Sequence, residues 1–167
     1  GVKTITEGVY FDGGLLFEKR FSIRNERTKH VYTSHERAGI INDLLAGIKP
    51  YIKEDDCLFA YGSIPAINYM TRTKPFIGCS WPELLSAPLL KQKLNNYKGP
   101  LPAILRQKFD SIGKEFGAPD ENYLIDCGVE AGTFKSNKKS QVVNEFIEKN
   151  NYKIVFENQY FILFLPQ

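Results

Sequence analysis

The chain has 167 residues, of which 43% are hydrophobic and 25% are charged. This length and composition suit one globular domain that buries a core without disulfides or metal ions. Its net charge of +3 is too small to indicate a nucleic-acid-binding protein. The three cysteines form no CxxC pair, which argues against a zinc site. We therefore expect no nucleic-acid partner, no metal and no cofactor.

The opening segment GVKTITEGVY lacks the basic and apolar parts of a signal peptide. No apolar run approaches the roughly 18 residues that a membrane-spanning helix needs. The leading Gly1 and the abrupt start predict that the chain is a piece of a longer protein. No internal repeat or low-complexity linker interrupts it, so residues 1–167 are expected to form a single domain.

The most informative stretch of the first half is 55–75, DDCLFAYGSIPAINYMTRTKP. Its apolar run Cys57–Tyr61 is typical of a strand that is buried on both faces. Before it, the capping box Thr33-Ser34-His35-Glu36 predicts a helix with Thr33 as its N-cap. That helix would run to about Ile52 and join a short strand at 30–33 to Cys57–Tyr61, as a strand–helix–strand unit.

The remaining elements follow from the same patterns of apolar and turn residues. Helices are predicted at 64–71, 89–97 and 140–149, strands at 101–108, 152–156 and 160–165, and a loop at 109–123. Together they predict an α/β fold with a mainly parallel sheet flanked by helices. We expect a three-layer, Rossmann-like arrangement with an antiparallel C-terminal hairpin at one edge.

In such sheets, ligands bind in the crevice at the carboxyl ends of the parallel strands. Gly62 and Ser63 follow the first central strand, and Arg106 lies at the end of the second. The candidate ligand-binding residues are Tyr61, Gly62, Ser63, Asn68, Tyr69, Arg72, Trp81 and Arg106. Each has a purely structural alternative: a tight strand-to-helix turn at Gly62-Ser63, an exposed strand end at Arg106, and half-buried packing for the others.

No catalytic residue is predicted. Ser63 stands in Y-G-S-I-P rather than in a G-x-S-x-G elbow. The histidines, His30 and His35, are not placed by any motif beside a nucleophile. The acids Glu54, Asp55 and Asp56 lie in a turn and lack the ligand spacing of a calcium loop.

Several stretches together resemble the soluble tail of polytopic membrane glycosyltransferases of the GT-C type. These are the dolichyl-phosphate-mannose-protein mannosyltransferase-like and aminoarabinose-transferase-like proteins. The similar stretches are T-S-H-E-R-A at 33–38, K-P-Y-I-K at 49–53, the run 55–75, and the terminal helix and hairpin at 146–165. A pattern of tyrosines and prolines in such tails is matched by Tyr61, Pro65, Tyr69, Thr71 and Pro75. The resemblance covers about 32–75 and 140–165.

This resemblance implies a non-catalytic domain on the extracytoplasmic, periplasmic face of a membrane. Its partner would be the membrane-embedded portion of the same polypeptide, which carries the catalytic acid of these enzymes. The family uses polyprenyl-phosphate sugars as donors, so the tail is expected to shape access of a glycan acceptor or a polyprenyl-phosphate sugar. The alternative is a free-standing soluble enzyme that binds a sugar or nucleotide at a Gly62–Ser63 cleft.

Overall fold

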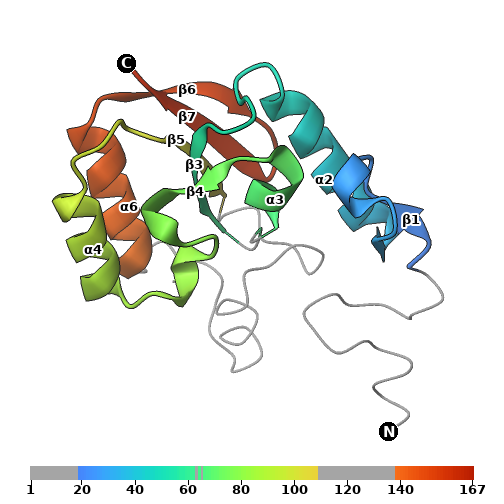
Figure 1. The fold of residues 1–167 in the computed structure, drawn as a ribbon, viewed down its shortest axis with the longest axis horizontal. Coiled ribbons are helices and arrows are strands. Elements are labelled where there is room, and N and C mark those ends of the chain that lie inside the picture. The colour runs from blue at the N-terminus through green and yellow to red at the C-terminus, as the bar shows by residue number, and fades with distance from the viewer. Residues whose placement is uncertain (1–18, 63, 65, 109–137) are drawn as a thin grey trace, which may run out of the picture.

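A mixed five-stranded sheet runs through the middle of the computed structural model, which describes residues 19–62, 64, 66–108 and 138–167 (Figure 1). The strand order is β4-β3-β5-β7-β6. The strands are β3 (Cys57–Tyr61), β4 (Lys74–Pro75), β5 (Ala103–Gln107), β6 (Tyr152–Glu157) and β7 (Phe161–Pro166). The predicted α/β class and the strand at Cys57–Tyr61 are therefore confirmed.

The sheet is parallel in one half and antiparallel in the other. Strand β3 pairs in parallel with both β4 and β5. Strand β7 then pairs antiparallel with both β5 and β6. The C-terminal hairpin thus occupies one edge of the sheet, as predicted, but the sheet is mixed rather than mainly parallel.

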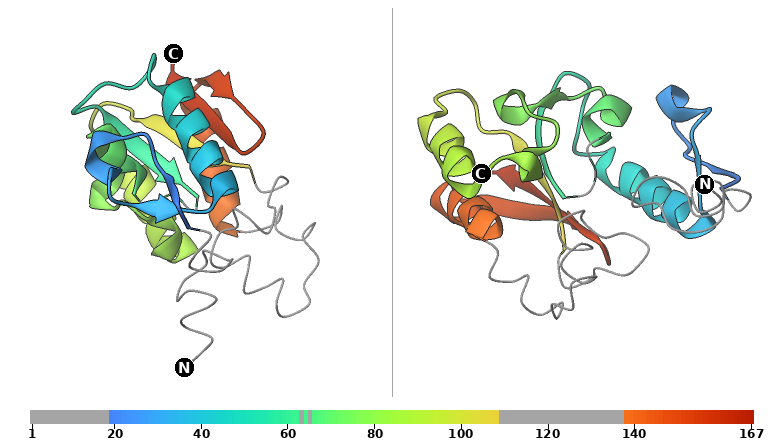
Figure 2. Two further views of the ribbon diagram at one scale, coloured as in Figure 1. Left: turned by 90° about the vertical axis from the view of Figure 1, so that its right-hand side faces the viewer. Right: turned by 90° about the horizontal axis from the view of Figure 1, so that it is seen from below.

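Helices cover both faces of this sheet. They are α2 (His35–Ile48), α3 (Ile67–Thr71), α4 (Ala87–Asn96) and α6 (Lys138–Lys149). Helices α4 and α6 lie side by side, and α2 lies toward the other end of the molecule (Figures 1 and 2). Residues of α2 and α3 pack into one hydrophobic cluster with the sheet, whereas residues of α4 and α6 pack into a second.

The side chains of β3 alternate between these two clusters. Leu58 and Ala60 belong to the cluster beneath α2 and α3. Phe59 and Tyr61 belong to the cluster beneath α4 and α6. Successive side chains of a strand point to opposite faces, so an uninterrupted apolar run is what a strand between two cores requires.

Helix α2 begins one residue later than the capping box predicts. Ser34, not Thr33, is the N-cap, and its side chain accepts a hydrogen bond from the backbone N–H of Arg37. Near the other end of the helix, a Cβ atom added to Gly47 would lie 2.1 Å from the ring of Phe156 on β6. The glycine therefore lets the helix backbone approach the hairpin closely.

The strand–helix–strand prediction is wrong in its topology. Strand β2 (Tyr32–Thr33) pairs with β1 (Phe21–Ser22) in a separate two-stranded antiparallel sheet, so it is not a neighbour of β3. A short 3-10 helix, η2 (Glu26–Thr28), connects β1 to β2. The motif predicted the helix correctly, but it could not specify the partner of so short a strand.

The region after β4 is more helical than its prolines and glycines suggest. Two 3-10 turns, η3 (Phe76–Gly78) and η4 (Pro82–Leu84), lead into α4. Helix α4 begins at Ala87 rather than at 89 as predicted, and Pro88 lies in its first turn, where a proline gives up no helical hydrogen bond. The predicted loop at 109–123 and the residues before 19 lie outside the described part of the chain. Among the described helices, none combines the length and the apolar character needed to cross a bilayer.

Replacing Leu58 with Asp should unfold the protein. Leu58 is fully buried, and an unpaired charge in an apolar core costs several kcal/mol. Leu84→Asp is the matched control, because Leu84 is 69% exposed. Thermal melting followed by circular dichroism should show a cooperative transition for the control only. A Leu58→Asp variant with an unchanged midpoint would contradict the central position of β3.

Candidate functional site

The carboxyl ends of β3 and β5 lie side by side, as the cleft prediction requires. Tyr61 is the register partner of Arg106 on β5. The Tyr61 side chain is buried, and its hydroxyl oxygen lies 3.5 Å from the Ser140 hydroxyl on α6. Arg106 donates a hydrogen bond from Nη1 to Oδ1 of Asn144 on the same helix. Both predicted residues therefore join the sheet to α6.

Gly62 has a structural explanation of its own. Its φ of +147° is one that residues with a Cβ rarely adopt. An added Cβ would lie 2.5 Å from the Cβ of Gln107. Only glycine fits this close approach between the ends of β3 and β5. Ser63, the next predicted residue, lies outside the described residues.

Trp81 lies at the same end of α6 as Tyr61. Its indole Nε1 donates to Oε2 of Glu83, 3.1 Å away. The backbone carbonyl of Glu83 in turn accepts a 2.6 Å hydrogen bond from Nζ of Lys139, which precedes Ser140 in α6. Trp81, Tyr61 and Arg106 are therefore connected through the first two turns of one helix.

Asn68 holds the connection after β3 in place. Its side-chain Nδ2 donates to the backbone carbonyl of Leu58 at 3.2 Å and to the Thr73 hydroxyl at 3.1 Å. The residue is only 5% exposed. Because the amide binds a strand carbonyl and the residue before β4, it fixes α3 against the sheet.

Tyr69 and Arg72 lie in a polar depression of about 570 Å³. We call this the α3 depression. Its other lining residues are Arg27, Glu54, Asp55, Asn68, Thr73, Lys74 and Pro75. Tyr69 is 56% exposed, and the Arg27 guanidinium carbon lies 4.9 Å from the centre of its ring, within the range of a cation–π contact.

Charge pairs surround this depression. Nη1 of Arg72 lies 2.8 Å from Oε1 of Glu54, and its Nη2 lies 3.6 Å from Oε2 of Glu26. Lys74 pairs with Asp55 at 3.4 Å. These side chains are largely exposed, so each pair adds little to stability. Their mixed charges suit a neutral, hydroxyl-rich ligand better than a strongly anionic one.

The seven predicted residues that the structure describes thus fall into two places. Tyr61, Gly62, Trp81 and Arg106 gather near the carboxyl ends of the strands, while Asn68, Tyr69 and Arg72 line the α3 depression near the amino end of β3. The cause is the direction of α3, which runs back along the sheet: the backbone carbonyl of Arg72 accepts a 3.0 Å hydrogen bond from the N–H of Asp55. Arg72 itself ends α3 in the left-handed conformation.

Arg27 and Glu54 are among the lining residues of the α3 depression that sequence reasoning missed. Arg27 lies more than forty positions before Tyr69, and nothing in the segment 26–28 marks it as a partner of that ring. The sequence placed the acids 54–56 in a turn and gave them no part in the candidate site, but Glu54 and Asp55 pair with the basic residues Arg72 and Lys74 that follow α3. Only the topology brings these residues together.

The described residues show little of the machinery of a catalytic site. They contain no group of three or more His, Cys, Asp or Glu side chains placed to hold a metal ion. Burial raises the pKa of the Cys57 thiol, an effect that the Lys74 ammonium partly offsets. Burial also raises the pKa of the Tyr152 phenol, which donates to the carbonyl of Pro102 at 2.9 Å. Both shifts favour the neutral thiol and the neutral phenol, the opposite of what activates a nucleophile.

Comparison of the chain with protein-family models, with curated proteins and with solved structures finds no match to any of them.

Replacing Gly62 with Ala should lower the free energy of unfolding by about 2 kcal/mol, because the positive φ is strained and the Cβ meets Gln107. Gly39→Ala is the matched control. Gly39 lies in α2 with no heavy atom within 4 Å of an added Cβ, so alanine there should stabilise by up to about 1 kcal/mol. Urea denaturation measures both changes. Equal stabilisation by the two substitutions would refute the packing role of Gly62.

Proposed function

We propose that the chain is a non-catalytic, extracytoplasmic domain of a membrane glycosyltransferase-like protein. It would lie on the periplasmic face, attached to the membrane-embedded portion of the same polypeptide. We propose further that the helices and the sheet form a three-layer, Rossmann-like arrangement. The two hydrophobic clusters on opposite faces of the sheet and the parallel order β4-β3-β5 support it.

The observation that carries the proposal is the α3 depression. It places an exposed tyrosine ring beside paired charges and backbone groups. Aromatic faces accept the apolar faces of sugar rings, while fixed polar groups orient hydroxyls. A domain with such a groove, and without a metal cluster in its described residues, is suited to holding a glycan acceptor rather than to reacting with it.

The resemblance to GT-C tails centres on the same region. Tyr61, Tyr69 and Thr71 are among the residues that carry it. Tyr61 is buried against α6, and Thr71 donates to the carbonyl of Ile67 at 2.7 Å. Tyr69 alone of these three is exposed to solvent. Two of the three residues therefore have structural roles, and Tyr69 is the one available to a ligand.

The α3 depression should bind short mannose- and glucosamine-containing oligosaccharides weakly, with a Kd of roughly 1 mM, about −4 kcal/mol. Amide signals of residues 68–74 should shift in an NMR titration. Tyr69→Ala should abolish these shifts, and Tyr51→Ala should leave them intact, since Tyr51 is also exposed but does not line the depression. Shifts confined to Gly62 and Arg106, or to the hairpin, would place the ligand elsewhere and refute the assignment.

The isolated chain should show no glycosyl transfer and no hydrolysis, because the described residues present no nucleophile with an activating base. A screen with polyprenyl-phosphate sugars, nucleotide sugars and simple esters tests this expectation. Reproducible turnover that a single substitution near Gly62 abolishes would favour the free-standing enzyme over the non-catalytic domain.

A further inference from the structure

The positive charge of the chain is concentrated in one short segment. Residues 19–37, here called the amino-terminal lobe, carry six Lys and Arg against two Glu, a net charge of +4. The rest of the chain carries sixteen against seventeen, a net charge of −1. The lobe comprises β1, η2, β2 and the first residues of α2. Overall net charge therefore conceals a strongly basic end of the molecule.

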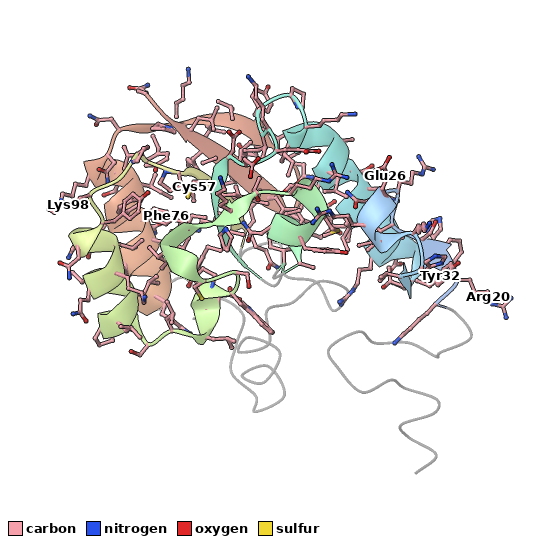
Figure 3. All side chains as sticks on the ribbon, in the orientation of Figure 1. Arg20, Glu26, Tyr32, Cys57, Phe76 and Lys98 are labelled. Carbon is pink, nitrogen blue, oxygen red and sulfur yellow. The ribbon has the colours of Figure 1, made fainter. Side chains whose placement is uncertain are left out.

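The basic residues of the lobe are accessible. Arg20, Arg24, Arg27 and Lys29 are all exposed. Figure 3 shows Arg20 and Tyr32 at the end of the molecule that lies farthest from α4 and α6. One of the two acids, Glu26, is turned toward Arg72 at 3.6 Å, so its charge is partly compensated outside the lobe.

Large apolar side chains are exposed on the same lobe. Phe21 is 43% exposed, Val31 is 49% exposed and Tyr32 is 53% exposed. All three lie on or next to the two-stranded sheet. Phe21 is the register partner of Thr33 and Tyr32 that of Ser22, so Phe21 and Tyr32 point to opposite faces of this ribbon.

A cavity of about 280 Å³ lies between the lobe, α2 and α3. Its lining is mostly apolar and includes Ile23, Val31, Ile41 and Met70, together with the guanidinium-bearing Arg27 and Arg37. Apolar walls with arginines among them suit an amphiphile whose anionic head is joined to a hydrocarbon chain. A nucleic acid would use the basic groups but would have no use for such a cavity.

We propose that the amino-terminal lobe binds the surface of an anionic phospholipid bilayer. Its basic side chains attract the lipid phosphates, and Phe21 and Val31 enter the headgroup region. The cavity receives part of one acyl chain. The inference goes beyond the proposed function, because a peripheral protein with no membrane-embedded portion would bind lipid in the same way.

The test is co-sedimentation of the 167-residue chain with vesicles of phosphatidylcholine alone or mixed with phosphatidylglycerol. Binding is expected only to the mixed vesicles and should weaken as salt is raised. Arg24→Gln with Lys29→Gln should reduce binding by about 25-fold, since each basic residue near an anionic surface contributes roughly fivefold. Val31→Ser should also reduce it, since Val31 is exposed and lines the cavity. Circular dichroism confirms that each variant is folded.

The matched control removes two exposed lysines from the far side, Lys93→Gln with Lys98→Gln, and should bind like the unchanged protein. Equal losses in both pairs of variants would show that overall charge is responsible and would overturn the assignment to the lobe. Absence of binding to mixed vesicles would overturn it as well. So would tighter binding to a single-stranded oligonucleotide than to mixed vesicles at equal salt. Oligosaccharide binding at Tyr69 should be unaffected by the lobe variants, so the two proposals fail separately.

Discussion

Strand β3 contributes side chains to two hydrophobic cores at once, and this double burial is the constraint that positions the other elements. Its small and aliphatic side chains, Leu58 and Ala60, face the cluster shared with α2 and α3. Its aromatic side chains face the other cluster, where Phe59 meets Phe76 at 5.6 Å between ring centres. Phe76 continues this contact to Tyr97 at 4.4 Å. Strand β5 pairs with Leu58–Tyr61 along one backbone edge, and β4 pairs with Cys57 and Leu58 on the other, so β3 has neighbours on both edges as well as on both faces.

Much of the fold could be predicted because its elements have strong local signals. The apolar run of β3, the stripe of α6 and the two runs of the hairpin are all visible in the sequence and are found within a few residues of their predicted bounds. The pairing of short strands could not be predicted. Strands β1, β2 and β4 contain two residues each, too few for a periodic pattern, so β2 was assigned to the wrong sheet.

The candidate site was predicted less well, because a site depends on directions that the sequence does not state. The rule that ligands lie at the carboxyl ends of strands grouped Arg106 with Arg72. Helix α3, however, runs back along β3, and the left-handed residue Arg72 turns the chain into β4 at the amino end. For Gly62 the sequence offered both a ligand site and a tight strand-to-helix turn, and the contact with Gln107 supports the structural alternative. Arg27, which stacks on Tyr69, carries no local signal at all.

The pairing of β5 with β7 also sets an order of events during synthesis. Ile104 and Leu105 are fully buried in the finished protein, but their antiparallel partners, Phe164 and Leu163, leave the ribosome about sixty positions later. Until then one edge of an apolar strand has no backbone partner, and such edges pair readily with other chains. The nascent chain is therefore most vulnerable to aggregation while the hairpin is still being synthesised. A chaperone that covers β5 during this interval would raise the yield of folded protein without changing the free energy of unfolding.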